Sequence, residues 1–220
     1  METKLLYLED CYIREFEANI IEAGSNFIVL DATYFHPQGG GQPGDTGEIA
    51  GIRIIDTKKM DGRIIHYFDG ECNLSAGQSV QCAIDWPRRY THMRIHSASH
   101  VAEHFLFQVC RDIKFLSSFI SGGKDTSSYE VAAAITPEHI KQIEDGANAF
   151  IKGGHDITLY ADENNPDYRY WKCGDIVYPC GGTHPKNTLE IGEISLKVKG
   201  QANLGRQKIV TTLAEGNYER

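Results

Sequence analysis

The chain from residue 5 to about residue 85 consists of short runs of β-branched and aromatic residues separated by turn residues. Clear examples are residues 27–30, 52–55 and 64–68. Between the last two runs lies Asp61-Gly62, a dipeptide that accepts the positive φ angles of a tight hairpin turn. We therefore expect these runs to pair antiparallel, and we assign residues 1–86 to a domain that is a small β-barrel or sandwich.

A helical periodicity begins at Trp86-Pro87. Proline is favoured in the first turn of a helix, and apolar residues then recur at helical spacing. They are Ile95, Ala98, Val101, Ala102, Phe105, Leu106 and Val109. This pattern predicts a helix from about residue 87 to residue 111.

Beyond that helix, strand and helix patterns alternate. Residues 117–120 and 130–135 are predicted to be strands flanking a turn at residues 122–125. A second helix is expected from Thr136-Pro137 to the glycines at 153–154, followed by a strand at residues 157–160. Residues 87–220 are therefore predicted to form an α+β domain with at least two helices on a sheet.

Charge and hydropathy exclude several classes of protein. The formal net charge of −8 argues against a protein that coats nucleic acid, because such binding depends on lysines and arginines neutralising phosphates. Any RNA contact must then be local. No apolar run approaches the roughly 18 residues of a membrane helix, and none resembles a signal peptide. We expect a cytoplasmic protein whose six scattered cysteines are mostly buried thiols.

The first chemical motif is His96-Ser-Ala-Ser-His100, inside the first predicted helix. Two imidazoles at this spacing lie one turn apart on nearly the same face, so both can reach one ion. His92 and His104 extend the row, and any adjacent pair of the four satisfies the geometry.

The second motif is Cys180-Gly-Gly-Thr-His184, which supplies a thiolate and an imidazole from a glycine-rich turn. Together the motifs offer a sulfur and several nitrogens, a donor set that suits tetrahedral Zn²⁺ better than Mg²⁺ or Ca²⁺. The sequence predicts one zinc ion per chain. Four protein ligands are typical of structural zinc, whereas catalytic zinc retains an open position. A metalloprotease helix needs a glutamate where Ser97 stands, so that activity is not expected.

These paired motifs resemble the editing domain shared by alanyl-tRNA synthetases and the free-standing AlaX editing proteins. The resemblance extends to residues 30–47, LDATYFHPQGGGQPGDTG, which are similar to the glycine-rich motif of the longer AlaX type. It covers nearly the whole chain. Three positions depart from the family pattern: Ser97 replaces a usual threonine, Pro185 a small aliphatic residue, and Leu189 a common glycine. These departures concern the shape of the pocket.

The resemblance implies a small β-barrel, a zinc-containing α+β editing domain, and a glycine-rich loop that approaches the editing centre. It implies hydrolysis of seryl-tRNA(Ala) and, in some members, glycyl-tRNA(Ala). It also implies that catalysis runs through a zinc ion held by His96, His100, Cys180 and His184. One ion could activate a water and polarise the ester carbonyl, or could only anchor the substrate amine. His92 and His104 could act around the ligands or simply be partly buried histidines.

Recognition of serine requires a buried partner for its hydroxyl group, because an apolar pocket separates serine from alanine poorly. By family spacing Ser117 is the nearest match, and Ser118 is its neighbour. Both could equally be ordinary strand serines. Thr183 could hydrogen-bond the substrate or only orient its turn.

Two further segments are candidates for contacts with the nucleic acid. In the glycine-rich segment, Thr33, Gly40, Gly41 and Gln42 could approach a ribose or phosphate, although a tight barrel turn would also select glycine. Between Glu193 and Glu215 the chain is basic without an acid, and this strip could hold the acceptor stem of tRNA(Ala) or be a solvated strand pair. Its cations are Lys197, Lys199, Arg206 and Lys208.

Two rival functions remain at this stage. A non-catalytic RNA-binding module with structural zinc would show metal-dependent folding without deacylation. A peptidyl-tRNA ester hydrolase is suggested by the tripeptide Gly40-Gly41-Gln42, which resembles that of peptide release factors, but this alternative explains no metal ligands.

Overall fold

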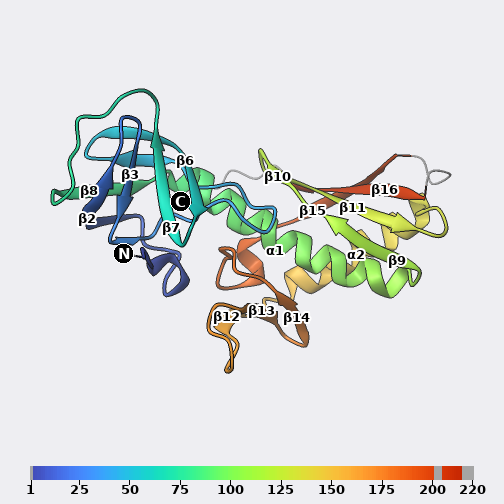
Figure 1. Ribbon diagram of the computed structural model, residues 1–220. Helices are drawn as coiled ribbons and strands as arrows, with labels where there is room; N and C mark the ends of the chain where they lie inside the picture. The colour runs from blue at the N-terminus through green and yellow to red at the C-terminus, as the bar shows by residue number, and fades with distance from the viewer. Residues whose placement is uncertain (1, 201–204, 215–220) are drawn as a thin grey trace. The chain divides into compact units, whose positions relative to one another are not determined.

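The computed structural model describes residues 2–200 and 205–214 (Figure 1). Glu215, which limits the basic strip, lies outside the described residues. The chain divides into two compact units, Met1–Tyr90 and Thr91–Arg220, and each is described here by itself. Both are rich in strands, and the described residues contain two α-helices, which confirms the predicted mixture of strand and helix.

In the first unit six strands form a closed barrel in the order β2-β3-β7-β6-β5-β8. Their bounds are β2 (Glu15–Ala23), β3 (Phe27–Leu30), β5 (Gly47–Ile49), β6 (Ile52–Met60), β7 (Arg63–Phe68) and β8 (Ser79–Ile84). Two short strands, β1 (Lys4–Leu5) and β4 (Ala32–Thr33), pair in parallel, and a 3₁₀ helix, η1, spans Leu6–Leu8. The barrel core is apolar, with Ile20, Ile28, Leu30, Ile49, Ile54 and Phe68 almost wholly buried.

The hairpin predicted at Asp61-Gly62 is confirmed. β6 and β7 pair antiparallel on either side of it, with Met60 opposite Arg63. Asp61 has a φ of 51° and Gly62 a φ of 75°, as a two-residue turn with two positive φ angles requires.

A buried ion pair joins the glycine-rich segment to the first turn of helix α1 (Trp86–Val109) inside the first unit. Arg89 and Asp45 are both fully buried, and the guanidinium Nε donates to the two carboxylate oxygens at 3.0 and 2.9 Å. Arg89 also donates to the carbonyl oxygens of Cys11 and Tyr34. Because the charge is paired and its donors are used, its burial is tolerated.

The second unit is built on a five-stranded sheet against which the helices pack (Figure 1). The strand order is β10-β11-β16-β15, with β9 also paired to β11. The bounds are β9 (Ile113–Ser117), β10 (Ile120–Ser121), β11 (Lys124–Val131), β15 (Ile194–Lys199) and β16 (Arg206–Leu213). Helix α2 (Pro137–Lys152) is capped by Thr136, whose hydroxyl accepts from the His139 amide, as its sequence predicted.

A smaller sheet, β12-β13-β14, carries the second chemical motif. Its strands are β12 (Ile157–Ala161), β13 (Arg169–Cys173) and β14 (Ile176–Pro179), and the 3₁₀ helix η2 (Thr188–Glu190) follows. Trp171 of β13 is fully buried in the core of this unit, together with residues of α1 such as Ile95 and Ala98. The strand predicted at residues 157–160 is confirmed.

Two predicted strand boundaries were wrong. Residues 117–120 are not one strand, because Ser118 and Phe119 separate β9 from β10. The turn between β10 and β11 needs only Gly122 and Gly123, both at positive φ, so β11 begins earlier than predicted. The strand ends at Val131 and residues 132–135 leave the ladder.

The cysteines agree with the prediction of reduced thiols, since all six are free and four are buried. Among the helices of the described residues, none has the length and apolar character that a membrane crossing demands.

Candidate metal centre

Two elements of the second unit bring four metal-binding side chains together. His96 and His100 project from one face of α1, and Cys180 and His184 come from the turn that follows β14. The backbone amide of Cys180 donates to the carbonyl oxygen of Arg169 at 2.8 Å and so ties the start of the turn to β13. The ligand atoms of the four residues all lie within 4.8 Å of one another.

The separations between these atoms suit a tetrahedral ion. The Cys180 sulfur lies 3.5 Å from His96 Nε2 and 3.2 Å from His184 Nε2. With a Zn–S distance of about 2.3 Å and a Zn–N distance of about 2.05 Å, tetrahedral geometry places sulfur and nitrogen about 3.6 Å apart. His96 and His184 therefore already lie near the distance from the Cys180 sulfur that a shared ion requires.

The protonation states of two of these groups affect cation binding in opposite directions. Burial lowers the pKa of His100 to about 4, so its imidazole is neutral at pH 7. His100 Nε2 is buried and has no hydrogen-bond partner among the described residues. Burial raises the pKa of the Cys180 thiol to about 11. An ion bound at this sulfur would replace the thiol proton, so binding would release a proton.

Ser97 and Trp171 fix the orientation of one ligand. Ser97 Oγ lies 2.8 Å from His184 Nδ1, and the indole Nε1 of Trp171 donates to the same oxygen at 3.2 Å. Ser97 and Trp171 are both fully buried. In the tautomer that leaves His184 Nε2 free for an ion, Nδ1–H donates to Ser97 Oγ. The hydroxyl can accept both hydrogen bonds because it has two lone pairs.

Aromatic rings enclose the second histidine of the helix. The Tyr178 ring stacks on the imidazole of His100 with centroids 5.2 Å apart, and the Trp171 ring lies 5.0 Å away. These apolar surfaces account for the burial that keeps His100 neutral.

The other two histidines of the row are not part of the ligand group that the described residues form. His92 is buried elsewhere on α1, and the ring of His104 contacts the amide of Gln108. Tertiary structure thus selects one of the adjacent pairs that the sequence left open.

Comparison with known proteins identifies the family of this chain. A family of class II (A) tRNA synthetases matches residues 2–88, and the second additional domain of threonyl- and alanyl-tRNA synthetases matches residues 169–210, which include Cys180 and His184. The alanyl-tRNA editing protein AlaX-M of Pyrococcus horikoshii is 33% identical over 94% of this chain and 96% of its own length. The chain belongs to the AlaX-M family of alanyl-tRNA editing proteins.

Other relatives also match most of this chain. AlaX-M of Saccharolobus solfataricus is 31% identical over 96% of this chain and 99% of its own length. The alanine–tRNA ligase of Sulfurisphaera tokodaii is 34% identical over 88% of this chain but only 24% of its own length. This chain therefore corresponds to about a quarter of the length of that ligase.

The glycine-rich segment connects two barrel strands, β3 and β5, and packs closely against the barrel. A Cβ atom at Gly44 would lie 2.1 Å from the carbonyl oxygen of Thr57, so glycine is required for close packing there. Thr33 is buried and its hydroxyl lies 3.0 Å from His66 Nε2. The side chain of Gln42 is also buried.

The tip of the segment is a tight turn. Gly40 and Gly41 have φ angles of 57° and 84°, and the backbone groups of Gly39 and Gln42 pair across them. Open space surrounds a Cβ built at Gly40. A ligand at this tip would therefore meet backbone groups and not the buried side chain of Gln42.

The two candidate serines point to different surroundings. Ser117 is exposed and lines a hollow on the sheet together with Ser128 and Lys208. Ser118 is half-buried, and its hydroxyl donates to the carboxylate of Asp125. Thr183 is fully buried next to His184.

Sequence analysis missed a buried polar cluster between α1 and the sheet. Asp125 is 1% exposed and accepts hydrogen bonds from the hydroxyls of Ser118 and Ser127. Glu103 accepts from the Tyr129 hydroxyl at 3.3 Å, and burial raises the pKa of Glu103 to about 7. The available signal was helical spacing, because Glu103 follows the two histidine ligands on the same face of α1.

Proposed function

We propose that the protein hydrolyses the ester bond between tRNA(Ala) and a wrongly attached amino acid, serine or glycine, in the cytoplasm. The observation that carries this proposal is the convergence of His96, His100, Cys180 and His184 in a chain of the AlaX-M family. We further propose that the ion is zinc, because one thiolate and three imidazoles suit Zn²⁺.

The residues of the chain have separate tasks in this proposal. A bound zinc ion would supply Lewis-acid chemistry for the hydrolysis of the ester. Ser97 holds His184 in the tautomer that can ligate, and Tyr178 and Trp171 keep water away from His100. Glu103, with a pKa of about 7, can hold or release a proton at neutral pH.

Substrate contacts are proposed for three groups of residues. Ser118 and Thr183 are candidates for the amino-acid pocket, and Ser117 remains one by family spacing although it lies on the exposed sheet. The Gly40-Gly41 turn, with Thr33 and Gln42 as its support, is a candidate for the ribose or a phosphate. The cations Lys197, Lys199 and Arg206 are candidates for the RNA backbone.

The test is deacylation of seryl-, glycyl- and alanyl-tRNA(Ala) by the purified protein, before and after chelation. We expect loss of the seryl or glycyl ester while the alanyl ester is spared, and abolition of activity by chelation and by Cys180→Ala. Cys110→Ala is the matched control, because Cys110 is a partly buried thiol of the same unit outside the ligand group. Inertness of the metal-loaded protein toward all three esters would refute the proposal.

The rival functions are disfavoured. A non-catalytic RNA-binding module would give no role to a buried carboxyl group with a pKa of about 7 on the helix that carries His96 and His100. A peptidyl-tRNA hydrolase would not explain relatives named for alanyl-tRNA editing over nearly their full length.

A further inference from the structure

One face of the five-stranded sheet in the second unit gathers positive charge. Residues of β11, β15 and β16 alternate between a face packed against the helices and an exposed face. On the exposed face lie six cations, and we call this surface the basic sheet face. The six are Lys114, Lys124, Lys197, Lys199, Arg206 and Lys208.

Strand register arranges these side chains in rows. Ser128 on β11 faces Ser117 on β9 and Lys208 on β16, and Lys208 in turn faces Lys199 on β15. Residues paired across strands point to the same face, so these four side chains form one row. Successive rows on one face are two residues apart, which is about 6.8 Å along a strand.

Within the sheet the positive charge is compensated only in part, by one acid that stands opposite Lys114 and Arg206. Among the described residues of its five strands, Glu130 is the one acid whose side chain lies on this face. In the described part of the chain none of the six cations forms an ion pair. This is unusual in a chain with a net charge of −8, because acids are abundant elsewhere.

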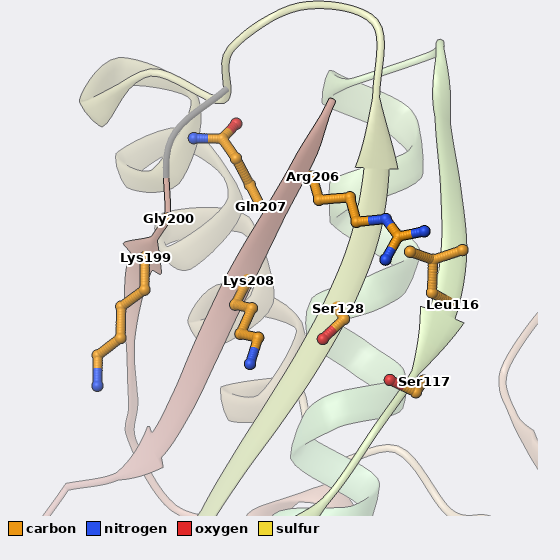
Figure 2. A pocket seen from close by; sticks show the side chains of 8 residues that line it. All are labelled: Leu116, Ser117, Ser128, Lys199, Gly200, Arg206, Gln207 and Lys208. Carbon is orange, nitrogen blue, oxygen red and sulfur yellow. The ribbon is translucent and has the colours of Figure 1, made fainter. Parts of the chain in front are cut away.

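The rows border a hollow of about 380 Å³ (Figure 2). Lys199, Lys208 and Arg206 line it, and Ser128 and Ser117 continue the row of Lys199 and Lys208 toward β9. Three cations and two hydroxyl donors without a carboxylate form an arrangement suited to a phosphate group.

Beside the hollow is a large apolar side chain. Phe119 is 60% exposed, and its backbone amide and carbonyl pair with those of Thr126 on β11, in the row next to that of Ser128. An exposed ring next to cations offers a surface for a ribose or base, because every base has a face that can stack.

We propose that the basic sheet face binds the sugar-phosphate backbone of RNA, with one phosphate in the hollow between Lys199, Lys208 and Ser128. The inference rests on the proposed function only in choosing tRNA(Ala) as the RNA. It adds Ser128, Lys114 and Lys124 to the RNA contacts. It also assigns Ser117 to phosphate binding instead of to amino-acid recognition.

The regular spacing of the cations favours RNA over an acidic protein segment as the ligand. The six cations extend over four strands in rows of regular separation, as a repeating polyanion requires. Phosphate contacts also have a specific signature, because each one releases bound counterions and steepens the salt dependence of binding.

The test measures the affinity for a tRNA(Ala) transcript that carries no amino acid, between 50 and 200 mM salt. It compares the full chain with the double variant Lys199→Ala/Lys208→Ala. The affinity of the parent protein should fall as salt rises across this range. In the double variant, which lacks two phosphate contacts, this fall should be about tenfold smaller. The matched control is Lys152→Ala/Lys172→Ala, which removes the same charge from exposed positions on α2 and β13. Ser128→Glu, which places a carboxylate at the hollow, should weaken binding more than Ser128→Ala.

The outcomes separate this inference from the proposed function. A salt slope equal to that of the parent protein in Lys199→Ala/Lys208→Ala, with seryl-tRNA(Ala) still hydrolysed, overturns the inference and leaves the function intact. A reduced slope in a protein that hydrolyses no ester supports RNA binding and refutes the function. Equal effects of the test and control variants would mean that only net charge matters, and would also overturn the inference.

Discussion

Replacement of Ser97 by alanine tests how the fold prepares a ligand for metal. The change removes the hydroxyl 2.8 Å from His184 Nδ1 and leaves the helix backbone as it is. Without its partner, His184 is no longer held in the tautomer that frees Nε2. Loss of such a supporting hydrogen bond typically lowers metal affinity by about 10- to 100-fold. That range corresponds to about 1.4–2.8 kcal/mol.

The same change has a separate cost in the metal-free protein. Trp171 Nε1 loses its acceptor at 3.2 Å, and the side chain of Trp171 is fully buried, so water cannot replace the hydroxyl. A buried donor left without a partner destabilises the fold by about 1–3 kcal/mol. Competition with a chromophoric chelator gives the affinity for zinc, and urea denaturation of the metal-free protein gives the stability.

Two variants control this experiment. Ser99→Ala removes a hydroxyl from the same helix that lies outside the ligand group, so zinc affinity should be unchanged. Ser97→Thr retains the hydroxyl and should restore most of the affinity. If Ser97→Ala binds zinc as tightly as the parent protein, Ser97 does not orient His184 and the reasoning is refuted.

Three further predictions follow from burial and charge. Because an ion must displace the Cys180 proton, whose pKa burial raises to about 11, zinc affinity measured by competition should rise about tenfold per pH unit between pH 6 and 8, and Cys180→Ala should abolish that slope. Burial raises the pKa of Glu103 from 4.5 to about 7, so the folded state holds this proton more tightly than the unfolded state. The free energy of unfolding should therefore fall as pH rises from about 4.5 through 7. Glu103→Gln should flatten this part of the profile in urea denaturation, and an unchanged profile would contradict the assigned cause. Arg89→Ala should destabilise the first unit by about 3–5 kcal/mol because it leaves the Asp45 carboxylate buried and unpaired. The double variant Arg89→Leu/Asp45→Leu should cost less in the same denaturation assay. Equal costs would show that the pair is not electrostatically coupled.

The sequence by itself determined the local elements and the donor set. Helical spacing placed His96 and His100 on one face of α1, and Asp61-Gly62 defined a hairpin, because both effects depend on a few neighbouring residues. The proline and threonine at the start of α2 acted in the same local way.

Only the tertiary structure decided which of the equivalent local choices is used. From the residues alone any adjacent pair in the histidine row could bind an ion, and packing against the turn after β14 selected His96 and His100. Ser117 and Ser118 are neighbours in sequence, yet strand register directs one to the basic sheet face and the other to Asp125. Periodicity shows which residues share a face, whereas long-range contacts determine what each face meets.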